Sequence, residues 1–194
     1  MKTYTATQIR NRLISWVAIL LLCIGSLSAQ KNATTGFVYE TSAGYMVGGS
    51  GDTYFFTYNA ALQASFAAGK NLTDKVILAG KVGIENNKEG IIYPLAIQLK
   101  KSFGKKSNQF LQLHAGYGLG SNHHTNENYK YRGGALAGLA YGLDIVQLGQ
   151  HKIYASLGIS LRRAKVVYQP FESSHEVIST VDNHFLGLEI GFQF

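Results

Sequence analysis

The sequence predicts an all-β fold: an eight-stranded antiparallel up-and-down barrel that crosses a membrane, preceded by an N-terminal signal peptide. Apolar residues alternate with small or polar residues along most of the chain, and the last ten residues end on the apolar face of such a pattern. Because successive side chains of a strand point to opposite faces, each such segment has one apolar and one polar face. The 22 glycines, 12 tyrosines and 10 phenylalanines, against two prolines, suit closely packed strands rather than a helical bundle.

Residues 1–29 have the layout of a secretory signal peptide. Lys2, Arg10 and Arg12 form a basic start, residues 13–24 are almost continuously apolar, and small residues precede Gln30. The apolar run is shorter than the ~20 residues that a membrane-spanning helix needs. We therefore expect cleavage after Ala29 rather than a retained anchor, which leaves residues 30–194 as a single barrel domain.

Charge and cysteine content exclude several functions. The formal net charge of +7 falls to +4 without residues 1–29, which hold three basic residues and no acid and so leave 15 basic and 11 acidic residues. No Lys/Arg block is interleaved with aromatics, so we expect no nucleic-acid partner. Cys23 is the only cysteine and lies in the signal, so the mature chain can form neither a disulfide nor a Cys-based metal site. Three leucines precede Cys23, where a lipoprotein signal needs small residues.

Eight segments show the alternation, with boundaries predicted to within a few residues. They lie near residues 35–48, 53–68, 75–85, 90–103, 108–120, 130–147, 151–168 and 183–194. The first segment carries the aromatics Phe37 and Tyr45. The apolar faces of the second and third, which are weaker, are Ala60, Leu62, Ala64 and Phe66, then Val76, Leu78, Val82 and Ile84. Those of the fourth and fifth are Tyr93, Leu95, Ile97 and Leu99, then Leu111, Leu113, Ala115, Tyr117 and Leu119. Those of the last three are Leu139, Tyr141, Leu143 and Ile145, then Ile153, Ala155, Leu157, Ile159 and Leu161, then Leu186, Leu188, Ile190, Phe192 and Phe194.

The connections differ at the two ends of the predicted barrel. Those after even-numbered segments are tight and polar, at residues 69–74, 104–107 and 149–150. Those after the fifth and seventh are longer, at residues 121–129 and 169–182. Short periplasmic turns opposite longer external loops are typical of membrane barrels.

The polar face carries most mid-strand charges. These are Glu40, Lys81, Lys100, Asp144, Arg162 and Glu189, and His114 shares their face. A Lys or Arg turned into hydrocarbon would cost ~2–4 kcal/mol, so this face must look inward. Three acids and three bases then balance in a lumen that eight strands leave just wide enough for side chains to fill. We expect them to form a polar network that plugs the barrel; a soluble barrel with an apolar interior is the rejected alternative.

Aromatic residues gather near the ends of the segments, as in the girdles of membrane barrels. We expect one rim at Tyr45, Tyr54, Phe56, Tyr58, Tyr93, Tyr131 and Tyr168 and the other at Phe37, Phe66, Phe103, Phe110, Phe192 and Phe194.

With these features the chain resembles the small eight-stranded outer-membrane β-barrel proteins of Gram-negative bacteria. The residues that carry the resemblance are the stretches 93–99, 113–120 and 188–194. The last is similar to the C-terminal signal read by the barrel-insertion machinery, with Leu188, Ile190, Phe192 and Phe194 as its apolar positions. The resemblance implies a monomer in the bacterial outer membrane, in contact with its lipid and lipopolysaccharide, and no cofactor.

Two loop motifs contain atoms that could support chemistry. His123 and His124, with Glu127, could bind a transition metal, although adjacent loop side chains rarely converge on one ion. Residues 173–176, Ser-Ser-His-Glu, contain the groups of a hydrolytic triad, but contiguous residues cannot reach one another in the required order. We therefore predict no catalytic and no metal-binding residue.

The sequence favours a non-enzymatic barrel with a structural role or a surface-interaction role through its external loops. Arg163 and Lys165 lie on the outward face beyond Leu161, where they could contact lipid headgroups. A lipid-modifying barrel enzyme and a narrow pore or transporter remain as alternatives.

Overall fold

A computed structural model describes residues 36–52, 55–87, 90–104, 108–121, 129–168 and 177–194. The predicted signal peptide lies outside the described residues. The eight strands are β1 (Phe37–Asp52), β2 (Phe55–Thr73), β3 (Val76–Asn87), β4 (Gly90–Phe103), β5 (Gln109–Gly120), β6 (Tyr129–Leu148), β7 (His151–Tyr168) and β8 (Val177–Gln193). Within the described ranges, no helix is long and apolar enough to cross a membrane.

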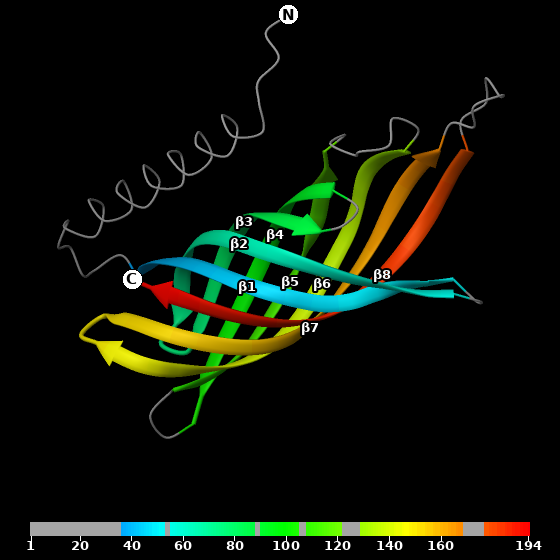
Figure 1. The fold of residues 1–194 in the computed structure, drawn as a ribbon. Coiled ribbons are helices and arrows are strands. Elements are labelled where there is room, and N and C mark those ends of the chain that lie inside the picture. The colour runs from blue at the N-terminus through cyan, green and yellow to red at the C-terminus, as the bar shows by residue number, and fades with distance from the viewer. Residues whose placement is uncertain (1–35, 53–54, 88–89, 105–107, 122–128, 169–176) are drawn as a thin grey trace, which may run out of the picture. The chain divides into compact units, whose positions relative to one another are not determined.

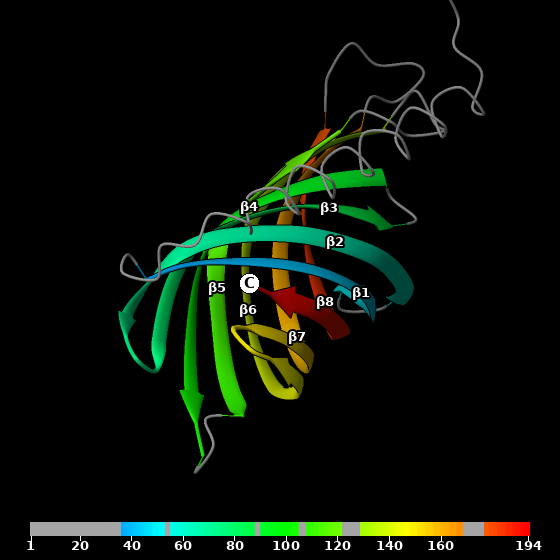
Figure 2. The same cartoon turned by 90° about the vertical axis from the view of Figure 1, so that its left-hand side faces the viewer.

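The strands form a closed antiparallel barrel in which each strand pairs with the next and β8 pairs with β1 (Figure 1). Figure 2 shows β8 beside β1, where the barrel closes. The last ladder bonds of this seam join Tyr39 and Phe194, whose backbone N–H groups each donate to the other's carbonyl at 2.9 Å. The predicted up-and-down topology is confirmed.

Two strand boundaries were wrong by more than a few residues. Strand β2 continues to Thr73 instead of ending near 68. Gly69 is not a turn residue: it lies where a Cβ would come within 2.2 Å of the Leu78 carbonyl oxygen, so it permits close approach of β2 and β3. Strand β8 begins at Val177, not 183. Residues 179 and 180 are both exposed. Where a strand extends beyond the hydrocarbon, its outward residues need not be apolar, so the sequence shows no alternation by which this part of β8 could be predicted.

The barrel is apolar outside and polar inside, the reverse of a soluble protein. Outward residues of every sector are exposed, for example Leu62 at 63%, Ile97 at 67% and Ile190 at 57%. Inward residues such as Gln98, Lys100 and Gln112 are at most 2% exposed. A continuous exposed apolar belt of this kind marks a membrane-facing surface.

One residue of the predicted faces needs correction, and one strand departs from regular alternation. Phe110 was expected in an outer aromatic rim, but its ring lies inside the barrel and is 1% exposed. It has the same strand parity as Gln112, which points inward. In β6, the register shifts between Asp144 and Val146, so that the predicted outward Ile145 and its neighbour Val146 are both exposed, at 61% and 38%, and Val146 pairs with Ile153. A bulge of this kind breaks the period-two alternation after one extra residue.

Candidate functional site: a polar network that fills the lumen

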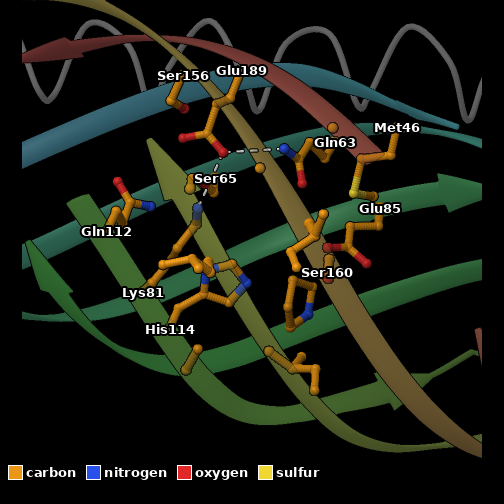
Figure 3. A pocket seen from close by; sticks show the side chains of 18 of the residues that line it. Met46, Gln63, Ser65, Lys81, Glu85, Gln112, His114, Ser156, Ser160 and Glu189 are labelled. Carbon is orange, nitrogen blue, oxygen red and sulfur yellow. Dashed lines mark hydrogen bonds and ion pairs between the residues drawn. The ribbon is translucent and has the colours of Figure 1, made fainter. Parts of the chain in front are cut away.

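Glu189 lies at the centre of the lumen and receives bonds from three other strands. Figure 3 shows the bonds from Gln63 and Lys81. Its Oε2 accepts from Lys81 Nζ at 3.3 Å and from Gln63 Nε2 at 3.1 Å, and the Tyr154 hydroxyl donates to Oε1 at 3.4 Å. The Lys81 and Glu189 side chains are 11% and 10% exposed. The tyrosine ring fits because Gly191 stands opposite, where a Cβ would come within 2.2 Å of it.

A second cluster surrounds Lys100 and Glu40. Lys100 Nζ donates to Glu40 Oε1 at 2.6 Å and to Gln193 Oε1 at 2.9 Å, while Gln98 Nε2 donates to Glu40 Oε2 at 2.7 Å. Gln112 Nε2 extends the chain of bonds to Gln98 Oε1 at 3.1 Å. Burial of both charges is tolerated only because their polar atoms are satisfied in this way.

Two aromatic rings complete the surroundings of Lys100. Its Nζ lies 4.2 Å from the centroid of Phe110 and 4.3 Å from that of Tyr154, within cation–π range. The two rings meet edge to face with centroids 5.3 Å apart. Phe110 therefore belongs to the interior network, which the predicted rim assignment missed.

A third cluster joins Arg162 and Glu85. Arg162 Nη2 donates to Glu85 Oε1 at 2.5 Å, and Nη1 pairs with the other carboxylate oxygen. The guanidinium carbon lies 5.0 Å from the centroid of Phe185. Glu85 was not among the predicted inward charges, yet it belongs to β3 and shares the parity of Lys81, a signal that could have identified it.

Asp144 faces inward but stands apart from these clusters. Its Oδ2 accepts from Lys152 Nζ at 2.7 Å, a partner on the adjacent strand near the β6–β7 turn. The sequence prediction had named Asp144 without this lysine.

His114 and a small cavity lie among the three clusters. The cavity has a volume of about 50 Å³, and its lining includes Lys81, Glu85, His114, Arg162 and Glu189. This volume suits a few water molecules. Within the described part of the chain, His114 Nδ1 is buried without a hydrogen-bond partner, and a water in this cavity could supply one.

The loop motifs cannot be placed. His123, His124 and Glu127, and residues 173–176, lie outside the described residues. Among the residues that the structure does describe, no group of three or more acidic, His or Cys side chains could hold a metal ion.

The outward basic residues lie where the sequence predicted them. Arg163 and Lys165 are exposed on β7. Arg163 forms a bidentate pair with Asp182 of β8, with Nε 2.8 Å from Oδ1 and Nη2 3.0 Å from Oδ2. Asp182 was not predicted as its partner, because the sequence predicts a loop over residues 169–182.

The C-terminal positions form part of the outer surface and of the rim at the short-turn end of the barrel. Leu188 and Ile190 are 54% and 57% exposed in the belt. The Phe194 ring stacks on Tyr39 at 5.9 Å between centroids and lies 5.5 Å from that of Phe192.

The apolar belt, the closed barrel and the charged, filled lumen together define an integral outer-membrane β-barrel protein. No protein-family model and no curated protein matches the sequence. The fold is similar to that of the outer-membrane protein AlkL in lipid bilayers, with a TM-score of 0.52 at 10% identity over 86% of this chain and 94% of that one. This likeness confirms the predicted fold class.

Two further solved structures have similar coverage. Neisserial surface protein A matches at 11% identity over 81% of this chain and 96% of its own, with a TM-score of 0.49. OprG of Pseudomonas aeruginosa matches at 11% identity over 82% and 96%, with a TM-score of 0.48.

Proposed function

We propose that this protein is a non-enzymatic outer-membrane barrel with a permanently filled lumen, which acts through its external loops or by reinforcing the envelope. The observation that supports this best is that three ion pairs cross the interior between strands that are not neighbours in the sheet. Lys100 of β4 reaches Glu40 of β1, Lys81 of β3 reaches Glu189 of β8, and Arg162 of β7 reaches Glu85 of β3.

These pairs oppose conduction for an energetic reason. Removing one partner from a buried ion pair costs about 3–5 kcal/mol, because the other charge is left without compensation. A solute path through the lumen would have to separate such pairs one after another. The three pairs also brace opposite walls, which suits a rigid scaffold that presents loops.

Planar-bilayer recording tests the closed lumen directly. The refolded mature chain should give no conductance steps at protein amounts where a general porin, reconstituted in parallel, gives many. Resolved steps that disappear when the protein is heat-denatured before addition would contradict the proposal and support a narrow pore.

Lipid analysis tests the absence of enzymatic activity. Mass spectra of lipid A and phospholipids from a deletion strain should equal those of the parent and of the complemented strain. A lipid species that is lost on deletion and restored by the gene would instead support the lipid-modifying alternative.

A further inference from the structure

A groove on the outer wall of the barrel carries an inference beyond the filled lumen. It has a volume of about 360 Å³ and crosses β6, β7 and β8. Its outward-facing lining consists of Ala135, Ala137, Leu161, Arg163, Asp182 and His184. These side chains are on the membrane side of the barrel wall. Leu136, Arg162 and Asn183, at inward positions of the same strands, complete the lining, and Leu136 and Arg162 also line the interior cavity.

The groove exists because two small residues occupy belt positions. Ala135 is paired with Tyr117 of β5, and Ala137 is paired with Leu161 of β7. Tyr117 and Leu161 are 47% and 48% exposed, and their larger side chains project further from the barrel wall than the methyl groups of the two alanines. Further along the same face of β6, Leu139, Tyr141 and Leu143 restore a full belt. The result is an apolar hollow rather than a flat wall.

One end of the hollow is charged. Arg163 donates from Nε and Nη2 to the Asp182 carboxylate, which holds the guanidinium in place. The N–H donors of Nη1 do not bond that carboxylate. Lys165 follows on the same outward face, and the exposed Arg132 lies on β6 beside Gly133, the partner of Lys165. At this end of the hollow, Arg163 and Lys165 thus place two exposed basic side chains beside Asp182.

We propose that this groove binds lipopolysaccharide, with an acyl chain on Ala135 and Ala137 and a phosphate at Arg163 and Lys165. An apolar hollow that ends at a fixed guanidinium matches an acylated, phosphorylated glycolipid, since guanidinium N–H groups bind phosphate oxygens in a defined geometry. The charged rim lies toward the longer connections, which in membrane barrels face the exterior. The leaflet on that side of an outer membrane consists of lipopolysaccharide.

Native mass spectrometry of the detergent-purified mature chain, titrated with rough lipopolysaccharide, tests the assignment. The R163Q/K165Q variant should bind roughly fivefold more weakly for each basic residue removed. A137L, which fills the hollow, should also lower the bound fraction. The matched controls are K101Q, an exposed lysine toward the opposite end, and A43L, an exposed alanine of another sector, and both should bind like the unchanged protein.

Three outcomes would overturn the assignment. The first is unchanged binding in R163Q/K165Q and A137L. The second is equal binding of phosphatidylglycerol, which would make the site one for any anionic lipid. The third is a dimer that A137L abolishes without loss of lipid, which would give the groove to a second copy of the chain. Heat-modified gel mobility of each variant checks that the barrel has folded.

Discussion

Lys81 of β3 and Glu189 of β8 meet across the lumen, with Nζ 3.3 Å from Oε2, although β1 and β2 separate their strands in the sheet. Glu189 also receives Gln63 and Tyr154, so a single carboxylate ties four strands together. Because the pair lies at mid-barrel and is nearly buried, its loss is felt by the whole closed sheet.

Removing the charge of Glu189 should destabilise the barrel strongly. E189Q leaves Lys81 buried without its counter-charge, and we expect a loss of about 3–5 kcal/mol in the free energy of unfolding. Urea titration in detergent measures this loss, with the heat-modifiable gel mobility of the folded barrel as the signal. D182N is the control: it breaks an ion pair whose side chains are 69% and 45% exposed, so solvent screens the attraction and little stability should be lost. Equal midpoints for the two variants would contradict a structural role for the network.

The glycines that face the interior aromatics should be irreplaceable by alanine. A Cβ on Gly142 would lie 2.1 Å from Phe110 Cζ, so G142A must displace the ring that packs on Lys100 and Tyr154. Overpacking of this kind costs about 1–3 kcal/mol. G80A is the matched control, since an added Cβ there meets nothing within 4 Å. Thermal unfolding of both proteins compares them, and a G142A midpoint equal to that of G80A would show that the ring is free to move.

The inward charges could be predicted from the sequence because hydrocarbon outside a barrel penalises any other placement. Their partners could not, because the contact between Lys81 and Glu189 depends on how far the strands are staggered around the closed barrel. Parity alone would have added Glu85 and Phe110 to the lumen, since they alternate in step with Lys81 and Gln112. Asp182 could not be predicted as a strand residue, because beyond the hydrocarbon both faces of β8 meet water and apolar and polar residues do not alternate.

The terminal aromatic should matter more for insertion in the cell than for stability. Phe194 adds a stacked ring to Tyr39 and closes the seam through backbone bonds that F194A retains. We expect F194A to refold in detergent almost as well as the unchanged chain, but to accumulate poorly in the outer membrane; F194Y should behave normally in both assays. Immunoblots of fractionated envelopes, compared with gel-shift yields in vitro, separate the two effects. Equal losses in both assays would make Phe194 a stability residue only.

Single cysteines should report the orientation of the barrel, since the predicted mature chain contains none. Thr180 is exposed near the long-loop end of β8, and Asp74 is exposed in the short β2–β3 turn. A membrane-impermeant maleimide added to whole cells should label T180C, and should label D74C only after the outer membrane is permeabilised. I97C, in the centre of the apolar belt, should resist the reagent under both conditions, because the thiol faces hydrocarbon. Labelling of D74C in intact cells, with T180C protected, would mean that the barrel is inserted the other way round, and would move the basic rim at Arg163 to the phospholipid leaflet.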